Sequence, residues 1–582
     1  MENTLKQEIL KVIKEKYSIS LYDLNLTIPP KKELGDFAFN CGILSRELKK
    51  SPAMIADDLL IELKNISLIK NVTNENGFIN ITLNTDIFTQ NFKNIYNSYL
   101  NDKNYFNIGA GSKLVVDYIG ANVGKPLHIG HMCTPNQGQA MINTYKKLGY
   151  DVISDSHIGD WGIIFGKLIL AYKLWGDEEK LKENAVDYLL ELYVKVTSEI
   201  ENDNELEQKT RDEFKLLSTG DKDSVELWRK FTSYSIEAMN KNLARLNVKP
   251  DYNIGESFYE GLGLPKMEDY PDLQFDMHSI VDELIEKGIA EKNDDNSVGV
   301  VFPGDKLPSC ILQKRDGTHG YLASDLASIK YRTTNWKPAK IVYFVDVRQQ
   351  LHFKQAFEIA KNAGWLGNTE LFHAYNGFIS GKEGAFSTRK GNIIKLSDLL
   401  DEAETRAKNI ILEKRSDLSD DELNNISKIV GIGAIKYGYL KKNRETDVIF
   451  DWDEFMTFEG NSGPYIQYAY VRAIRILENS LETDFSKEIG VNFENSEEFD
   501  LIKVLSNYKE VLIETSTKNA PHILCKYAYD LTKSFNSFYN SVHILNETDV
   551  EKKYARLKLL NLFLLTIKDS FNLLGIDMPN KM

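Results

Sequence analysis

One segment constrains the fold of this chain more than any other, because a short apolar run leads directly into a loop with two histidines. The run Lys113–Gly120 (KLVVDYIG) is rich in β-branched and aromatic residues, which predicts a buried strand. The loop Ala121–His131 (ANVGKPLHIGH) follows at once, and a helical pattern then extends to about Leu148. A strand, a loop and a helix in this order predict the first half of a parallel α/β unit.

The position of this loop suggests what it binds. A loop after a parallel strand opens at the carboxyl edge of the sheet, and the next helix directs free N–H groups there, so phosphate is the expected ligand. Gly130 lets a nucleotide approach the backbone, and His128 and His131 can donate hydrogen bonds to phosphate oxygens as charge builds up. The alternatives are two ordinary loop histidines or a metal pair, although a metal needs a third ligand and this segment offers no obvious one. Pro135 removes a backbone donor, so the next helix either starts late or is kinked.

A second unit of the same kind lies at Lys340–Trp365, where Ile341–Asp346 is apolar and extended and the following residues are helical. Two such units predict one sheet interrupted by a charged helical insertion. Residues 1–105 alternate helical patterns with the strand-like run Gly77–Asn84, which indicates a small α+β unit, whereas nearly every segment from about Leu396 onward has a helical period.

We therefore expect an α/β multidomain protein built around a Rossmann-like parallel sheet. The expected domains are a small α+β domain at 1–105, the parallel-sheet domain at 106–395 with a helical insertion at about 168–275, a helical connector at 396–450 and an all-α bundle at 451–582.

Composition narrows the class of protein. The chain has 582 residues with 71 Lys and Arg against 85 Asp and Glu, and its 42% hydrophobic content is that of a globular protein. Four widely spaced cysteines without a C-x-x-C pair exclude a disulfide framework and a zinc ribbon, and they favour a reducing, cytoplasmic setting. No apolar run is long enough for a membrane span, and the first residues lack a signal-peptide core. The net charge of −14 does not exclude a nucleic acid, because steering depends on where the cations lie.

The loop and several later motifs resemble class I aminoacyl-tRNA synthetases, and specifically the arginyl-tRNA synthetase family. Val115–His131 resembles the arginyl form of the family's His-x-Gly-His loop through Asp117, Asn122 and Lys125. Further resembling segments follow in the family's order: HIGDWG (157–162), YLASDLASIKYR (321–332), VDVRQQLHFKQ (345–355), SGPYIQYAYVRAIRIL (462–477) and LLGIDMPNKM (573–582). The resemblance covers nearly the whole chain.

The resemblance implies that L-arginine is activated with Mg-ATP to arginyl-adenylate and pyrophosphate, and is then transferred to the 3′ end of tRNA(Arg). It implies neither a covalent enzyme intermediate nor a metal held tightly by the protein. It assigns ATP binding to Lys125, Pro126, His128, Gly130, His131, Ser387 and Thr388, and catalysis to His128, His131, Arg389 and Lys390.

The amino-acid pocket is predicted partly from spacing and partly from the resemblance. Tyr321 and Asp325 are four residues apart on a helical segment, so they face the same way. Asp325 can accept both arms of a guanidinium, and Tyr321 offers a hydroxyl group and an aromatic face. The resemblance adds Asp117, Asn122 and Gln349 around the charged ends of arginine. The alternative for Tyr321 and Asp325 is a solvated helix face. The resemblance places Asp160 and Trp161 beside the active site, and the alternative for them is a tight turn that packs its tryptophan into the core.

The second signature loop of class I synthetases lies at Ser380–Asn392 (SGKEGAFSTRKGN) and departs from the family pattern. Ala385 and Phe386 stand where the first Lys and the Met are expected. The cation that meets the phosphates therefore stays open, with Arg389 and Lys390 preferred over Lys125 and Lys382. A solvated basic turn is the alternative interpretation.

Cations and aromatic residues near the C-terminal third offer contacts for tRNA. Lys441, Lys442 and Arg472 can meet phosphates and Tyr468 can stack on a base, although a solvated helix face is the alternative for each charge. We expect a monomer without membrane contact. Two rival functions stay open: a nucleotidylyltransferase that shares the phosphate loop, and a tRNA-binding paralogue that has lost catalysis, which the altered Ala385–Lys390 loop would suit.

Overall fold

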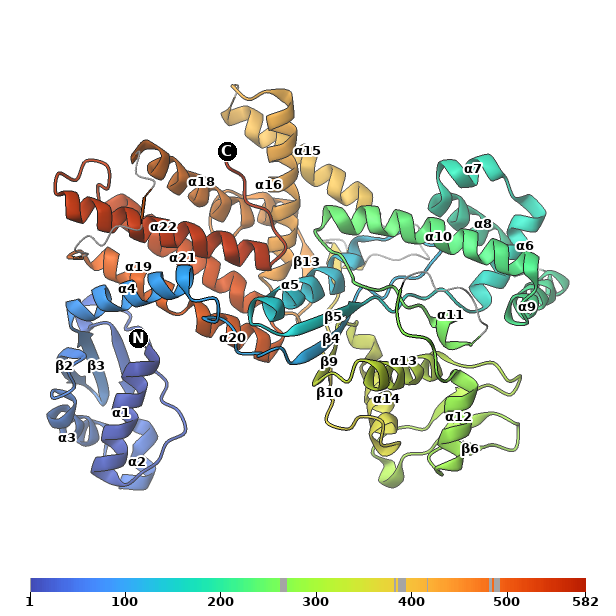
Figure 1. Ribbon diagram of the computed structural model, residues 1–582, viewed down its shortest axis with the longest axis horizontal. Coiled ribbons are helices and arrows are strands. Elements are labelled where there is room, and N and C mark those ends of the chain that lie inside the picture. The colour runs from blue at the N-terminus through green and yellow to red at the C-terminus, as the bar shows by residue number, and fades with distance from the viewer. Residues whose placement is uncertain are drawn as a thin grey trace. The chain divides into compact units, whose positions relative to one another are not determined.

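The computed structural model resolves the chain into two compact units (Figure 1). One unit contains residues 1–105, 469–511 and 527–569, and the other contains residues 106–468, 512–526 and 570–582. The structure describes residues 2–201, 203–261, 269–381, 384–385, 394–415, 417–480, 484–485 and 492–582.

The N-terminal part of the first unit is a three-stranded antiparallel sheet with the order β1-β3-β2, covered by helices. Its elements are α1 (Glu2–Tyr17), the short 3-10 helix η1 (Lys32–Leu34), β1 (Phe37–Asn40), α2 (Gly42–Leu48), α3 (Pro52–Leu63), β2 (Ile69–Glu75), β3 (Phe78–Leu83) and α4 (Thr85–Asn101). Asn76 and Gly77 join β2 to β3 with φ of 53° and 87°, the left-handed pair that a two-residue hairpin requires. The strand predicted at Gly77–Asn84 is confirmed as β3.

The helical part of the first unit is formed by α19 (Ser496–Ser506) and by most of the C-terminal helices. The boundary between the two units falls inside four helices: α18 (Gly463–Ser480), α20 (Tyr508–Lys518), α21 (Pro521–Ser541) and α22 (Val550–Leu573). Phe88 of α4 packs on Phe499 of α19 with ring centroids 4.8 Å apart.

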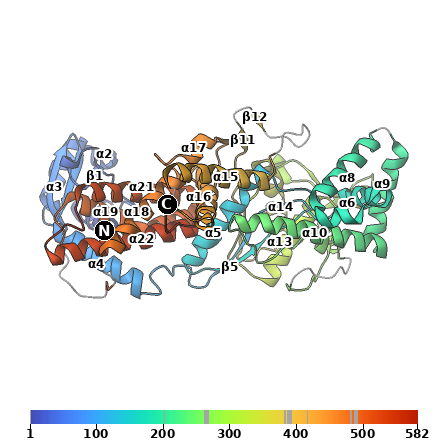
Figure 2. The ribbon, with the colours of Figure 1, turned by 90° about the horizontal axis from the view of Figure 1, so that it is seen from above.

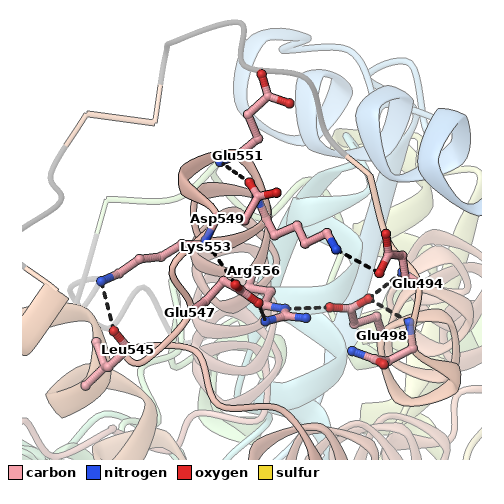
Figure 3. Close-up of polar contacts among 10 residues, drawn as sticks. Glu494, Glu498, Leu545, Glu547, Asp549, Glu551, Lys553 and Arg556 are labelled. Carbon is pink, nitrogen blue, oxygen red and sulfur yellow. Dashed lines mark hydrogen bonds and ion pairs between the residues drawn. The ribbon is translucent and has the colours of Figure 1, made fainter.

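A buried charge network ties α22 to α19 (Figure 3). Arg556 Nε donates to Glu498 Oε1 at 2.7 Å, and its Nη1 donates to Glu547 Oε2 at 2.6 Å. Only 2% of the Glu498 side chain is exposed, whereas the neighbouring pair Lys552–Glu494 lies at the surface. The buried pair is therefore the stronger constraint on how α22 sits against α19.

The second unit is organised around a parallel sheet with the order β10-β9-β4-β5. Its strands are β4 (Lys113–Asp117), β5 (Asp151–Asp155), β9 (Lys340–Tyr343) and β10 (Glu370–His373). Helix α5 (Thr134–Lys147) connects β4 to β5, and α14 (Gln350–Asn362) connects β9 to β10. The prediction of one interrupted sheet is confirmed, because β4 and β9 are direct neighbours. Strand β4 ends at Asp117, before the predicted Gly120, because Ile119 and Gly120 adopt positive φ and turn the chain.

A long stretch between β5 and β9 interrupts this sheet and is largely helical. It contains α6 (Ile163–Trp175), α7 (Glu178–Glu183), α8 (Ala185–Ile200), α9 (Asn204–Ser218), α10 (Lys222–Arg245), α11 (Glu256–Tyr259), α12 (Met277–Glu286), the small sheet β6 (Glu291–Lys292), β7 (Val298–Val300) and β8 (Cys310–Gln313), the 3-10 helix η3 (Pro303–Asp305) and α13 (Tyr321–Asn335). Helices α6, α8 and α9 pack together in Figure 2. Helix α13 packs on α14 and returns the chain to the sheet (Figure 1).

The remaining elements of the second unit are two 3-10 helices beside the sheet and a helical region after it. They are η2 (Ile129–Met132), η4 (Val347–Gln349), β11 (Ile379–Gly381), β12 (Gly384–Ala385), α15 (Leu396–Lys414), α16 (Asp420–Leu440), β13 (Val448–Phe450) and α17 (Trp452–Met456). Ser419 and Glu422 cap the start of α16 reciprocally. None of the helices in the described part of the chain has both the length and the apolar character that crossing a membrane requires.

Candidate active site

The two histidines of the ANVGKPLHIGH loop are held by the backbone of their own turn. The His128 N–H donates to Nδ1 of His131 at 3.0 Å, and the Gly130 N–H donates to Nδ1 of His128 at 3.1 Å. Their ring centroids are 4.2 Å apart. Nδ1 of His131 also lies 3.3 Å from the His128 carbonyl, but its contact with the His128 N–H is shorter, so the favoured tautomer of each neutral imidazole carries its proton on Nε2. The pair therefore offers two Nε2–H donors.

Both imidazoles are neutral at physiological pH. Burial, together with the neighbouring His128, lowers the pKa of His131 to about 3. Burial and the positive charge of Arg348 lower the pKa of His128. Arg348 lies in η4, directly after β9, so the turns after β4 and β9 meet at the same edge of the sheet. The histidines can thus polarise a phosphate as hydrogen-bond donors without carrying a charge themselves.

The backbone joins this loop to the residues that follow the second signature loop. The Ile129 N–H donates to the Ile394 carbonyl at 3.0 Å, and the Leu396 N–H donates to the Leu127 carbonyl at 2.9 Å. The predicted phosphate contacts Ser387, Thr388, Arg389 and Lys390 lie outside the described residues, as do Lys382 and Phe386. Lys125 is half-buried, with its ammonium group 4.9 Å from the centre of the Tyr193 ring, and burial lowers its pKa. Pro126 is half-buried beside it.

Helix α5 begins late rather than being kinked. The chain runs through η2, and α5 then starts at Thr134 with Pro135 in its first turn. A proline is tolerated there because the first N–H groups of a helix have no partner within the helix. Of the two alternatives that the sequence left open, the structure selects the late start.

The HIGDWG segment extends the β4–β5 pairing beyond the strands. The Val123 N–H donates to the Gly159 carbonyl, and the Gly159 N–H donates to the Ala121 carbonyl, each at 3.0 Å. A Cβ atom at Gly159 would lie 2.3 Å from Oδ1 of Asn122, so any larger residue here would displace that side chain. Trp161 is buried against Trp228, and the Asp160 carboxylate accepts from the backbone and hydroxyl of Ser257. Packing within the core therefore explains the positions of the Asp160 and Trp161 side chains.

Asp117 is occupied by a partner from α13. The side chain of Arg332 is fully buried and pairs with Asp117 Oδ2 and Asp155 Oδ2, both at 2.7 Å. Burial raises the pKa of Asp117 to about 6 despite the guanidinium beside it. Asp117 was predicted to contact the charged end of arginine. The pairing with Arg332 anchors α13 to the carboxyl ends of β4 and β5, and the contact of Asp117 with arginine stays a prediction.

Asp325 lies about two helical turns before Arg332 on α13 and faces two histidines. Its Oδ2 is 2.5 Å from Nε2 of His352, and its Oδ1 is 3.9 Å from Nε2 of His157. Burial alone would raise the pKa of Asp325, but the hydrogen bond from His352 and the nearby positive charges lower it. Asp325 is thus an ionised, largely buried carboxylate at the edge of the sheet.

Glu256, at the start of α11, is a carboxylate that the sequence analysis did not select. Burial and the neighbouring charges of Asp160 and Asp325 raise the pKa of Glu256 to about 9. Its charge also acts on the hydroxyl group of Tyr321. Glu256 and Asp325 therefore create an environment that favours a cation. The ESFY segment carries no spacing that links it to α13, so only the fold brings Glu256 here.

Three other predicted arginine contacts lie at the surface. Tyr321 opens α13 and is 74% exposed, and Asn122 and Gln349 are exposed on the turns after β4 and β9. Their exposure leaves them available to a ligand at the carboxyl edge of the sheet.

The predicted tRNA contacts divide into two kinds. Lys441 and Lys442 both pair with Glu454, at 2.9 Å and 2.8 Å, and only 9% of the Lys441 side chain is exposed. These pairs connect the end of α16 to α17. Tyr468 is 45% exposed on α18, and Arg472 lies one turn later with its guanidinium 4.9 Å from the centre of the Tyr539 ring.

Three protein families match successive parts of this chain, and full-length relatives match it as a whole. Residues 94–452 match the family described as tRNA synthetases class I (R), catalytic domain. Residues 466–582 match the DALR anticodon binding domain, and residues 3–83 match the arginyl tRNA synthetase N terminal domain. The chain is 37% identical to an arginine–tRNA ligase of Clostridium botulinum, covering 99% of this chain and 100% of that protein. It is 36% identical to that of Fusobacterium nucleatum, covering 97% and 96%.

Solved structures show the same fold over the full length. Arginyl-tRNA synthetase from Plasmodium falciparum superposes with a TM-score of 0.79 at 22% identity, covering 100% of this chain and 99% of that one. The Thermus thermophilus arginyl-tRNA synthetase gives a TM-score of 0.79 at 21% identity and covers 100% of both chains. The expected fold class, a Rossmann-like domain with a helical insertion between an α+β domain and a helical bundle, is confirmed.

Proposed function

The chain belongs to the arginyl-tRNA synthetase family, and on this premise we propose that it is an arginine–tRNA ligase. It activates L-arginine with ATP, releasing pyrophosphate, and transfers the arginyl group from arginyl-adenylate to the 3′ end of tRNA(Arg). One observation on the candidate active site supports the proposal most directly. The imidazole pair and the Asp325 carboxylate, which His352 of α14 contacts, both lie near the carboxyl ends of the neighbouring strands β4 and β9.

The acidic pocket suits a guanidinium. Asp325 supplies an ionised carboxylate, and Glu256 supplies a second one that a bound cation would ionise. Tyr321 at the start of α13 adds an aromatic face, and Asp117, Asn122 and Gln349 are proposed to lie around the charged ends of arginine. A substrate without a guanidinium would leave buried carboxylates unpaired, so it is rejected strongly and no separate editing site is needed.

The reaction then needs alignment and charge stabilisation rather than a nucleophilic side chain. The arginine carboxylate attacks the α-phosphorus of ATP, and pyrophosphate leaves. His128 and His131 donate from Nε2 to phosphate oxygens as negative charge grows, and Gly130 allows the nucleotide to approach. Mg²⁺ enters with ATP as part of the substrate. Arg389, Lys390, Ser387 and Thr388 are proposed to meet the phosphates, with Lys125 and Pro126 at the base of the loop.

The helical C-terminal region is proposed to hold the tRNA. Tyr468 and Arg472 share one face of α18 because they are four residues apart. Lys442 keeps a partly exposed ammonium group, whereas Lys441 contributes mainly through its pairing with Glu454. Residues 451–582 are the proposed anticodon-binding domain, 396–450 the connector, 106–395 the catalytic domain with its insertion at about 168–275, and 1–105 the N-terminal tRNA-contacting domain.

A cytoplasmic monomer is the proposed form of the protein. The four cysteines are free thiols, and Cys41, Cys133 and Cys525 are buried, which suits a reducing compartment.

Two assays with the purified full-length chain test the proposal. The first attaches labelled arginine to total tRNA, and the second measures pyrophosphate exchange into ATP with and without arginine. We expect charging with arginine and with no other amino acid. Charging with a different amino acid would contradict the pocket assignment. Exchange that does not depend on arginine would favour a nucleotidylyltransferase, and tRNA binding without either reaction would favour an inactive paralogue.

A further inference from the structure

Three potential metal ligands converge outside the HIGH-type loop and the guanidinium pocket. Glu260, His278 and His319 each offer one ligand atom, and these three atoms lie within 4.8 Å of one another. The rings of His278 and His319 are 4.4 Å apart in an edge-to-face arrangement. Nδ1 of His319 is 3.8 Å from Oε2 of Glu260, which is too long for a hydrogen bond. Tetrahedral zinc ligands lie roughly 3.3 Å apart, so a small contraction would complete the site.

The three residues come from separate segments, each fixed by its own backbone. Glu260 ends α11, and the following Gly261 has a φ of +76° and no space for a Cβ atom against Asp276. Asp276 in turn caps α12, which carries His278 in its first turn. Glu260 and His278 are therefore brought together by tight packing between Gly261 and Asp276.

His319 is fixed by the turn that connects β8 to α13. It pairs with Gln313 across this turn, the Lys314 N–H donates to the Thr318 carbonyl at 2.8 Å, and the Gly320 N–H donates to the Leu312 carbonyl at 3.0 Å. This backbone directs the imidazole toward α11 and α12 rather than toward solvent.

One nitrogen of the buried His319 imidazole, Nε2, has no hydrogen-bond partner among the described residues, while Nδ1 is the nitrogen nearer Glu260. Only 2% of the His319 side chain is exposed. A buried polar group without a partner is costly, and histidine in such a position suits a metal ion. This observation is independent of the clustering of the three residues.

We propose that Glu260, His278 and His319 form a binding site for a divalent transition-metal ion, with zinc as the best-suited metal. Two imidazoles and one carboxylate are a known zinc donor set, and they leave one coordination position for water. The ion would cross-link α11, α12 and the β8–α13 turn. Because Glu256 begins α11 and Tyr321 begins α13, the ion would stiffen the two segments that carry these side chains. The site does not depend on the proposed ligase activity, and its test does not use that activity.

The test uses the full-length chain after treatment with a chelator and desalting. Co²⁺ is titrated while its visible d–d absorption is recorded, and Zn²⁺ is then added to displace it. We expect one equivalent of tightly bound Co²⁺ per chain, without the intense sulfur charge-transfer band that cysteine ligation would give. Zn²⁺ should raise the melting temperature of the wild-type protein, because a ligand that binds only the folded state stabilises it.

His278→Ala is the decisive variant, because His278 is exposed and its removal should leave the fold intact. We expect His278→Ala and Glu260→Gln to weaken Co²⁺ binding by roughly 100-fold and to abolish the Zn²⁺-dependent rise in melting temperature. His543→Ala removes an exposed histidine of the other unit and should retain wild-type binding. Absence of stoichiometric binding in the wild type would overturn the proposal. Wild-type affinity in His278→Ala, with an unchanged melting temperature of the metal-free protein, would overturn it as well.

Discussion

The His128 N–H donates a 3.0 Å hydrogen bond to Nδ1 of His131, and this contact determines which nitrogen of the His131 ring faces outward. The ring is thereby held as a neutral Nε2–H donor, with its pKa lowered to about 3 by burial and by His128. The turn of the backbone thus orients this imidazole, and burial keeps it neutral.

Two substitutions of His131 should distinguish the roles of its two ring nitrogens. An asparagine can accept the His128 N–H but lacks the Nε2–H, so His131→Asn should fold normally and lose roughly 100- to 1000-fold in kcat for pyrophosphate exchange. His131→Gln keeps a donor near Nε2 but leaves the His128 N–H without its acceptor, so it should be less stable and more active than His131→Asn. Thermal unfolding and exchange kinetics measure both. Equal activity in the two variants would mean that the Nε2–H is not used.

Glu256 should make arginine binding pH-dependent. Burial and nearby carboxylates raise the pKa of Glu256 to about 9, so its carboxyl group is neutral at pH 7 in the free protein. A guanidinium favours the ionised form, so binding should release a proton, and affinity should rise by up to about tenfold per pH unit between pH 7 and 9. Calorimetry in buffers of different ionisation enthalpy measures this release. Glu256→Gln should flatten the dependence, and an unchanged slope in that variant would assign the proton to another group.

Removing the charge of Asp325 should affect arginine and spare ATP. Asp325→Asn loses the ionised acceptor that His352 now holds in place. We expect the KM for arginine in pyrophosphate exchange to rise by roughly 100-fold, because charge-assisted hydrogen bonds in a buried site are lost. The KM for ATP should change little. Asp282→Asn, at an exposed position of α12, serves as the matched control and should behave as wild type.

The Arg556 network offers a matched pair of stability tests (Figure 3). Arg556→Ala leaves the buried Glu498 carboxylate without its guanidinium and should lower the free energy of unfolding by roughly 3 kcal/mol. Lys552→Ala removes an ion pair of α22 at the surface and should cost at most about 1 kcal/mol. Urea unfolding followed by circular dichroism compares them. Similar losses in both variants would show that burial of the Glu498 pair contributes no extra stability.

The sequence by itself determined those features of the protein whose residues are close together along the chain. The β4 strand and the two-histidine loop follow from local residue pattern, because strand propensity acts over a few residues, whereas the sequence left open whether Pro135 delays or kinks α5. The identity of the family follows likewise from motifs that are each contiguous. The alternation of helices and strands also predicted one interrupted sheet, since two α/β units need each other to bury their faces.

Tertiary structure alone decided which distant side chains meet. The sequence did not predict that Asp117 pairs with Arg332, because α13 returns across the ends of β4 and β5 only after a long insertion. Glu256 reaches the pocket, and Glu260 meets His278 and His319, through packing between segments that share no sequence period. Spacing predicts neighbours only within one helix or strand, whereas these contacts depend on how separate elements bury their surfaces against one another.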